Sequence, residues 1–236
     1  MLYLIGLGLG DEKDITLRGM EIAKKCECFV ETYTSKWEGD IRSLERIVGN
    51  NIKQIRRKDL EDNQKEFLKN CEDKDVALFV LGDPLAATTH IDLVIEAKNL
   101  NIPVKIIHNS SVFSALGEFG LQMYKYGRTV TIPFSNKLDS VRDALKSNKK
   151  AGLHTLLLLD LDAEVGLYMK VKDALKLLLD AKLIKKNDKI ISGKIGKEIY
   201  YDSVSNMLEK EIETPSAIVI PGKLHFREKE YLEMIK

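Results

Sequence analysis

Cysteine is scarce in this chain, which limits both disulfide bonds and metal sites. Cys26, Cys28 and Cys71 are the only cysteines among 236 residues. They are too few and too unevenly spaced for a disulfide framework or a four-thiolate metal site. A metal site at Cys26 and Cys28 would need further ligands nearby, and the expected alternation of these two side chains argues against it. We therefore expect reduced, buried thiols and no bound metal.

An excess of charge of one sign and long apolar runs are also lacking. The 37 basic residues nearly balance the 36 acidic ones, which gives a formal net charge of +1. This balance argues against nucleic acid or a membrane surface as a partner, so any macromolecular partner must be recognised by shape. No segment approaches the roughly 20 apolar residues that span a bilayer, and no secretory signal precedes the first apolar segment. We expect a cytoplasmic protein.

The clearest feature that is present is a short, uniformly apolar segment at residues 76–81, which stops abruptly at Gly82-Asp83-Pro84. Its length and uniformity predict a parallel strand that is covered on both faces. Ligands of open parallel sheets bind beyond the carboxyl ends of the strands, so Asp83 is a candidate site residue. The alternative is that Gly-Asp-Pro is only a strand-ending turn, because all three residues are common in turns.

The first half of the chain alternates between strand-like and helix-like segments. The expected strands are residues 2–7, 29–34, 52–55, 76–81 and 104–107. The expected helices are one capped by Thr16, residues 41–48, residues 59–71, one capped by Thr89, and one that follows Ser111 and buries Val112, Ala115 and Leu116. This alternation predicts an α/β domain over residues 1–110 with a mainly parallel five-stranded sheet.

The second half, residues 111–236, has a less regular pattern that predicts a mixed sheet. The expected strands are residues 129–132, 155–159 and 217–220, with 189–192 and 198–201 paired as a hairpin. The expected helices are residues 138–146, one that buries Val171, Ala174, Leu175 and Leu178, and a C-terminal one that buries Tyr231, Leu232 and Ile235. Asp160 and Asp162 could bind a cation, but no third ligand lies nearby, so we favour a strand-end cap.

Candidate site residues follow several of the expected strands. The tips of the first, fourth and fifth strands supply Leu9, Asp83 and Ser111 to what would be one crevice. The first tip is rich in glycine, but a dinucleotide fingerprint would require glycine at the position that holds Asp11. The sequence therefore gives little support to a nicotinamide cofactor.

Two histidines lie at strand-to-helix junctions. His90 begins the helix after Thr89, for which we expect Ile91, Val94 and Ile95 as the buried face. We expect His90 to be exposed or locally hydrogen-bonded, and a catalytic role is the less favoured alternative. His225 follows the last strand, where it could contact a ligand.

Six motifs in order give the chain a family resemblance. They are MLYLIGLGLGDEKDIT at the start, YTS at 33–35, GDPLAATTH at 82–90, IHNSSVFSA at 107–115, GLHTLLLLD at 152–160 and PGKLH at 221–225. Together they resemble the tetrapyrrole-methylase-like, S-adenosylmethionine-dependent methyltransferases. The ATTH extension and the His-Thr-Leu strand are similar to the diphthine synthase branch of that group. The chain departs from the pattern in three places: the segment after Pro133 is shorter, the region before Ile190 is trimmed, and little follows the last helix.

The resemblance implies a homodimeric enzyme of two α/β domains with a cofactor cleft between them. It implies S-adenosylmethionine as co-substrate, S-adenosylhomocysteine as product, and translation elongation factor 2 as protein substrate. The enzyme would trimethylate the amino group of that factor's 3-amino-3-carboxypropyl-histidine, with no catalytic side chain assigned. The implied cofactor contacts are Leu9, Asp83, Ala86, Ser111, Val112, Leu159, Ile195 and His225.

Two other functions remain open from the sequence. One is a methyltransferase of the same fold that acts on a small tetrapyrrole precursor. The other is a ribosome-associated binding module that keeps the fold but has no catalytic turnover. The shortened loops suggest this alternative.

Overall fold

A computed structural model describes residues 1–235 of the chain. The chain divides into two compact units. Unit 1 comprises Met1–Ser114 together with Asp162–Val165, and unit 2 comprises Ala115–Leu161 and the described residues from Gly166 onward. Among the helices of the described part, none is long and apolar enough to cross a membrane.

Unit 1 is built on a five-stranded, fully parallel sheet, as the sequence predicts. Its strands are β1 (Leu2–Gly6), β2 (Glu27–Glu31), β3 (Ile52–Ile55), β4 (Val76–Val80) and β5 (Val104–Ile107), in the order β3-β2-β4-β1-β5. All five residues of the central strand β4 are buried. This burial on both faces is the reason why its sequence is continuously apolar rather than alternating.

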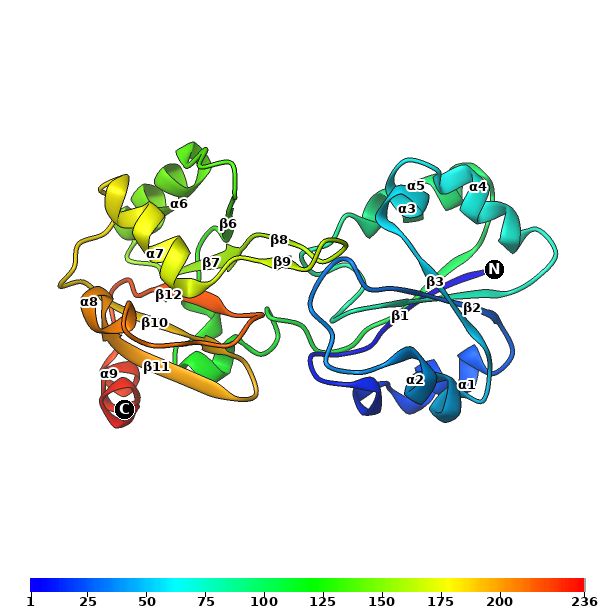
Figure 1. The fold of residues 1–236 in the computed structure, drawn as a ribbon, viewed down its shortest axis with the longest axis horizontal. Helices are drawn as coiled ribbons and strands as arrows, with labels where there is room; N and C mark the ends of the chain where they lie inside the picture. Colours follow the sequence, from blue (N-terminus) through cyan, green and yellow to red (C-terminus); the bar gives the residue numbers. More distant parts are fainter. Residues whose placement is uncertain (236) are drawn as a thin grey trace. The chain divides into compact units, whose positions relative to one another are not determined.

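Helices cover both faces of this sheet (Figure 1). One face carries α1 (Leu17–Ala23) and α2 (Ile41–Val48), and the other carries α3 (Arg57–Glu61), α4 (Gln64–Leu68) and α5 (His90–Asn99). Thr16 caps α1 as predicted, because its hydroxyl oxygen accepts the N–H of Gly19 at 3.0 Å. Two short 3-10 turns, η1 (Glu12–Asp14) and η2 (Lys69–Cys71), complete the unit up to β5.

The single helix predicted over residues 59–71 is wrong, because the chain forms α3, α4 and η2 there instead. The break falls at Asp62 and Asn63, whose backbone N–H groups both bond to the carbonyl of Lys58. Short polar side chains such as these favour helix ends over helix interiors.

The predicted orientation of α5 is also wrong. Its buried residues are His90, Leu93, Val94 and Ala97, whereas Ile91 and Ile95 are 50% and 51% exposed. These four positions follow the i, i+3, i+4, i+7 spacing of one helix face. Of the two alternatives expected for His90, exposure is therefore wrong, and the Thr89 side chain makes no cap. The Thr89 hydroxyl donates instead to Glu61 Oε1 at 2.8 Å.

Unit 2 contains the mixed sheet that the sequence predicts. Its strands are β6 (Val130–Ile132), β7 (Thr155–Leu159), β10 (Lys189–Lys194), β11 (Glu198–Ser203) and β12 (Ala217–Ile220), in the order β11-β10-β12-β7-β6. Only β6 and β7 pair in parallel. The expected hairpin is confirmed as the β10–β11 pair. A separate two-stranded ribbon joins β8 (Leu161–Asp162) to β9 (Leu167–Tyr168).

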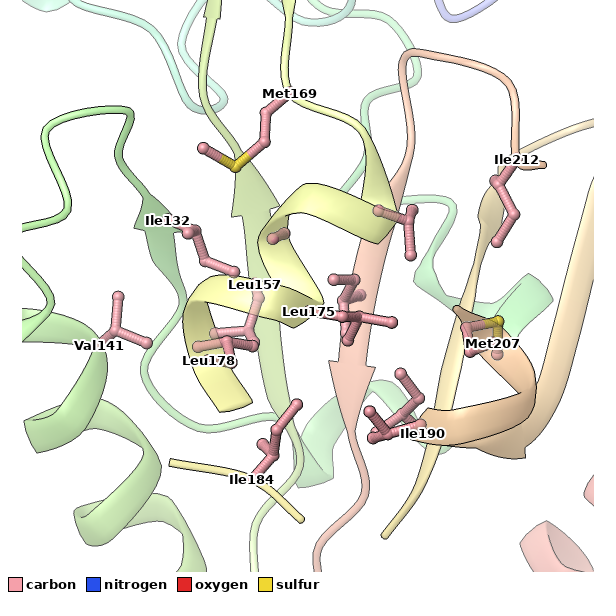
Figure 2. Close-up of a cluster of buried hydrophobic side chains, with 14 of the residues drawn as sticks. Ile132, Val141, Leu157, Met169, Leu175, Leu178, Ile184, Ile190, Met207 and Ile212 are labelled. Atoms are coloured by element: carbon pink, nitrogen blue, oxygen red, sulfur yellow. The ribbon is translucent and has the colours of Figure 1, made fainter. Parts of the chain in front are cut away.

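The core of unit 2 lies between this sheet and the helices α6 (Asp139–Ala151), α7 (Val171–Asp180) and α8 (Val204–Met207). Figure 2 shows Leu175 and Leu178 of α7 directed at Leu157 and neighbouring strand residues. All four residues predicted for the buried face of α7 are buried, since Val171 is 2% exposed and the other three are fully covered.

Three helical segments after residue 110 differ from the prediction. No α-helix follows Ser111, because a hydrogen-bonded turn with Ser114 leads only to the 3-10 turn η3 (Leu116–Phe119). A second 3-10 turn, η4 (Met123–Lys125), comes before β6, and α6 runs through residues 147–150. In the last helix, α9 (Phe226–Met234), Leu232 is buried but Tyr231 is 45% exposed and Ile235 lies past the helix end.

Candidate functional site

The tips of β1 and β4 are joined by two glycines. Gly8 and Gly82 exchange both backbone hydrogen bonds, at 3.1 and 2.9 Å, and have φ angles of +80° and +71°. Only glycine adopts that conformation without strain. A Cβ on Gly6 would lie 2.6 Å from the carbonyl oxygen of Gly82, so the two loops also approach too closely for a side chain.

Asp83 organises the loop that follows β4. Its carboxylate is 12% exposed and accepts hydrogen bonds from His108 Nδ1 at 2.8 Å and from the backbone N–H of Asn109 at 3.1 Å. The other oxygen accepts the N–H of Leu85 at 3.1 Å. The bonds from His108 and Asn109 tie the Gly-Asp-Pro loop to the tip of β5, and the bond from Leu85 closes the loop on itself. The carboxylate is therefore largely committed to the protein itself.

Asn109 is a site residue that the sequence analysis did not single out. Its amide Nδ2 donates to the carbonyls of Gly6 and Asp14, both at 2.9 Å, and its Oδ1 accepts the N–H of Ser110 at 2.7 Å. One side chain at the end of β5 thus holds the loop after β1. The polar IHNSS segment after the fifth strand indicated a site residue in this region. The sequence alone does not show which of its side chains bridges the loops.

Five of the predicted contact residues lie at one edge of the unit 1 sheet. Leu9, Asp83, Ala86, Ser111 and Val112 follow β1, β4 and β5, which are adjacent and parallel. Leu9 is 38% exposed and Ser111 is buried, while Ala86 and Val112 are half-buried. This edge offers glycine backbone, the small side chains of Ala86 and Ser111, and the apolar side chains of Leu9 and Val112 to a ligand.

The register of the unit 2 sheet separates the remaining three predicted residues. Leu159 ends β7 and Ile195 follows β10, and both lie near the start of β12, since Ala217 pairs with Leu158 and with Gly193. His225 follows the opposite end of β12, where Ile220 pairs with Thr155. β12 is four residues long, so its two ends are about 10 Å apart. Leu159 and Ile195 are therefore brought together, and His225 is not.

A second residue that the sequence analysis missed lies at the Leu159 end of this sheet. Ser216 immediately precedes β12, and its buried Oγ has no hydrogen-bond partner among the described residues. Buried hydroxyls are normally hydrogen-bonded, so this one is available to a water molecule or a ligand. Nearby, Gly196 N–H donates to Glu118 Oε2 at 2.7 Å, which fixes the turn that carries Ile195.

The side chain of His225 is exposed, but its backbone N–H joins a buried polar network around Glu228 that secures α9. Its N–H donates to Glu228 Oε2 at 2.6 Å, and Glu228 also accepts from Lys125 Nζ and His154 Nε2. His154 Nδ1 accepts the N–H of Gly222, so its proton lies on Nε2. Burial alone would raise the pKa of Glu228, but these donors outweigh it and lower the pKa to about 2.

Unit 1 holds its own buried ionisable groups near the tips of β2 and β4. Glu31 is fully buried, and burial raises the pKa of its carboxyl group although Thr34, Leu81 and Tyr33 donate to it. His90 is 2% exposed, and burial lowers its pKa to about 4, so the ring is neutral near pH 7. Its Nε2 lies 3.4 Å from the hydroxyl of Tyr33.

Metal-ligating side chains do not gather in the described part of the chain. Within residues 1–235, no group of three or more His, Cys, Asp or Glu side chains is placed to hold a metal ion. The three cysteines are buried and unpaired. Burial raises their pKa values to about 11 for Cys26 and Cys71 and to about 12 for Cys28, which disfavours the thiolate that binds metals.

Comparison with known proteins places this architecture in a family. The profile of the tetrapyrrole (corrin/porphyrin) methylases matches residues 1–209. The chain is 38% identical to the diphthine methyl ester synthase of Dictyostelium discoideum, over all of this chain and 98% of that protein. It is 36% identical to the diphthine synthase of Methanocaldococcus jannaschii, with the same coverage.

A solved structure agrees with the sequence comparisons. A crystal structure of diphthine synthase superimposes with a TM-score of 0.92 at 31% identity, over 99% of this chain and 95% of that one. The agreement covers residues of both units and is not limited to one shared sheet. The chain therefore belongs to the tetrapyrrole (corrin/porphyrin) methylase family and is a methyltransferase.

Proposed function

We propose that this methyltransferase uses S-adenosylmethionine to trimethylate the amino group of the 3-amino-3-carboxypropyl-histidine of translation elongation factor 2, a step in diphthamide biosynthesis. The observation that carries the proposal is similarity over the whole chain to proteins named diphthine synthase and diphthine methyl ester synthase. Those names refer to diphthine rather than to a tetrapyrrole, which argues against the small-molecule alternative.

The residues at the edge of the unit 1 sheet fit such a co-substrate. Methyl transfer removes positive charge from the sulfonium, so a free carboxylate beside the sulfur would stabilise the ground state more than the transition state. Asp83 is engaged by three protein donors. We propose that it shapes the loop and faces the ligand's hydroxyl or ammonium groups, while Leu9, Ala86, Ser111 and Val112 line the pocket.

We further infer that the region 111–236 completes the pocket that the region 1–110 begins. Leu159 and Ile195 support this assignment because they lie at one end of the unit 2 sheet. We propose Ser216 in the place first given to His225, since its unpartnered hydroxyl lies at that same end. The exposed His225 would then serve α9 rather than the ligand.

The chemistry requires alignment more than it requires a catalytic side chain. S-adenosylmethionine supplies an activated methyl group, and in-line placement against the amine can contribute up to about 7 to 11 kcal/mol. The accepting amine must be neutral, whereas an ordinary alkyl amine has a pKa of about 10.4. Burial lowers such a pKa by disfavouring the cation. We therefore assign positioning and desolvation to the protein and name no general base.

The proposal includes the surroundings in which the enzyme works. We infer a homodimer in the cytoplasm that engages the folded elongation factor directly and binds neither nucleic acid nor membrane. The balanced charge of the chain supports recognition by shape rather than by a polyanionic surface. Size-exclusion chromatography with light scattering tests the dimer.

The decisive experiment is incubation of the purified chain with methyl-labelled S-adenosylmethionine and elongation factor 2 that carries the 3-amino-3-carboxypropyl group. We expect label in the factor, and three added methyl groups by mass spectrometry of the modified peptide. Binding of S-adenosylmethionine without transfer to the factor would refute the substrate assignment. A bound donor that keeps its methyl group through a single-turnover incubation would favour the binding-module alternative.

A matched pair of variants tests the site. Asp83→Ala removes three hydrogen bonds from the loop at the carboxyl edge, so we expect the affinity for S-adenosylmethionine to fall by at least about tenfold in calorimetry. Asp73→Ala removes an exposed carboxylate just before β4, at the other edge of the same sheet, and should leave that affinity unchanged. Equal affinities for both variants would contradict the placement of the site.

The names of the relatives also suggest a second possible reaction product, a methyl ester. The Dictyostelium protein is named for the methyl ester, and the Methanocaldococcus protein is not. The same mass spectrum separates the two outcomes, because an ester adds a fourth methyl group and is lost on mild alkaline hydrolysis.

A further inference from the structure

Arg57 carries a guanidinium group that donates no hydrogen bond to the part of the protein that the structure describes. It is the first residue of α3, immediately after the tip of β3, and its side chain is 44% exposed. Its ion-pair partner among the described residues is Glu61, with Nε and Oε1 3.8 Å apart, which is beyond hydrogen-bonding distance. Within residues 1–235 the guanidinium donates no hydrogen bond.

The guanidinium is nevertheless held in a defined place. Its Cζ lies 5.2 Å from the centroid of the Tyr33 ring, a stacking arrangement that suits the planar arginine head. Tyr33 is itself fixed: it is 3% exposed, its N–H donates to Glu31 Oε2 at 3.0 Å, and its hydroxyl lies 3.4 Å from His90 Nε2. The arginine thus rests on a buried, hydrogen-bonded support.

The two carboxylates near Arg57 make their hydrogen bonds to groups other than its guanidinium. Glu61 Oε1 accepts the hydroxyl of Thr89 at 2.8 Å. Glu164, in the loop between β8 and β9, uses Oε1 to accept the backbone N–H of Arg57 at 3.3 Å. Neither carboxylate takes the paired N–H groups of the guanidinium. A planar fork of donors with no internal acceptor matches a carboxylate, which can accept two parallel hydrogen bonds from it.

The position of this group relates it to the proposed pocket. Tyr33 and Arg57 follow β2 and β3, and Leu9, Asp83 and Ser111 follow β1, β4 and β5 of the same parallel sheet. The carboxyl edge therefore has two parts. The β4-β1-β5 part presents glycine backbone and small side chains, and the β3-β2 part presents a fixed cation.

We propose that Arg57 binds the carboxylate of the substrate's 3-amino-3-carboxypropyl group, with Tyr33 and His90 acting as positioning residues for its guanidinium. This assignment rests on the proposed function, in which that carboxylate is attached to the same carbon as the accepting amine. Holding both carboxylate oxygens orients the amine for repeated methylation. It also keeps the carboxylate from acting as a methyl acceptor, which would limit ester formation.

The test compares Arg57→Gln and Arg57→Lys with the control Arg56→Gln, which removes a neighbouring exposed arginine. Charge-assisted hydrogen bonds of this kind correspond to about tenfold to hundredfold in affinity. We expect Arg57→Gln to raise KM for the modified elongation factor by that factor and to leave the Kd of S-adenosylmethionine and the melting temperature unchanged. Arg57→Lys keeps the charge without the fork and should lie between Arg57→Gln and the wild type.

The number of methyl groups on the product is an independent readout. With Arg57→Gln, the fraction of product that carries an alkali-labile methyl ester should rise relative to the wild type, because the carboxylate is no longer held. A purely structural role of Arg57 would not change that fraction.

The outcomes separate this proposal from the function on which it rests. A wild-type enzyme that binds S-adenosylmethionine but does not methylate the factor would refute both. Suppose instead that the wild type is active. If Arg57→Gln has the same KM as the wild type, or if Arg56→Gln raises KM as much as Arg57→Gln does, the role of Arg57 is refuted and the proposed function stands. An Arg57→Lys enzyme that equals the wild type would show that charge suffices and would refute the bidentate contact.

Discussion

The burial of His90 makes a quantitative prediction about acid stability. An unfolded histidine has a pKa near 6.5, and burial lowers that of His90 to about 4. Between these values the unfolded chain binds a proton that the folded chain does not, so stability falls as the pH decreases. From about pH 7 to about pH 5 the loss is about 2 kcal/mol, and it approaches about 3 kcal/mol once the pH falls to the folded pKa.

Urea denaturation followed by circular dichroism at both pH values gives the free energy of unfolding. We expect the wild type to lose about 2 kcal/mol more between them than His90→Gln, in which the titrating group is absent. Taking the difference between the proteins removes the contributions of His154 and the buried carboxyl groups, which both proteins share. Below the folded pKa, His90 is protonated in both the folded and the unfolded chain. The plots of unfolding free energy against pH for the wild type and His90→Gln should therefore become parallel there.

Ile95→Gln is the matched control, because it introduces the same amide on the exposed face of the same helix. It should show the pH dependence of the wild type. If His90→Gln and the wild type lose stability equally between the two pH values, His90 is not a buried neutral imidazole and the reasoning is refuted. His90→Phe serves as a second variant and should behave as His90→Gln does.

Three further predictions concern stability and thiol reactivity. Leu178→Ala should lower the free energy of unfolding by about 2 to 5 kcal/mol in urea titrations, because the side chain is fully buried in the unit 2 core; a loss below about 1 kcal/mol would contradict that packing. Gly193→Ala should lower the melting temperature in calorimetry, because its Cβ would lie 2.1 Å from the carbonyl oxygen of Glu198, whereas Gly117→Ala has open space and should not. The three cysteines should not react with a disulfide reagent near pH 8 until denaturant is added, because burial raises their pKa values; rapid modification of the folded protein would exclude their burial.

The strands could be predicted well because each is marked by a short apolar segment between polar or glycine-rich turns. The limits expected for β3, β5, β7 and β12 match the structure to the residue. The carboxyl-edge position of Leu9, Asp83 and Ser111 followed from the rule that the carboxyl ends of parallel strands lie at one edge of the sheet. The sequence was sufficient where local pattern alone decides the structure.

The buried faces of the helices were harder to predict because polar residues can occupy buried positions. Because His90 was assigned to the surface, the wrong face of α5 was predicted to be buried. The spacing of His90 with Leu93, Val94 and Ala97 nevertheless fits one helix face. Its Nε2 contacts the hydroxyl of Tyr33, 57 positions earlier in the chain. Such a long-range partner is not visible in the local sequence.

The candidate site shows a different limit. Leu159, Ile195 and His225 were grouped by resemblance, but the strand directions of β7, β10 and β12 decide which of them are neighbours. An antiparallel partner reverses the end at which a following loop emerges. The orphaned hydroxyl of Ser216 is likewise a property of packing that no motif reveals.

The reciprocal hydrogen bonds between Gly8 and Gly82 have a consequence for substitutions near the ligand. Because each loop supplies both a donor and an acceptor to the other, neither can shift without breaking two bonds at once. The two loops are thus mechanically coupled, and damage to either one should appear as disorder in both. Hydrogen exchange at these two amides would report on ligand-induced ordering of the whole edge from a single pair of signals.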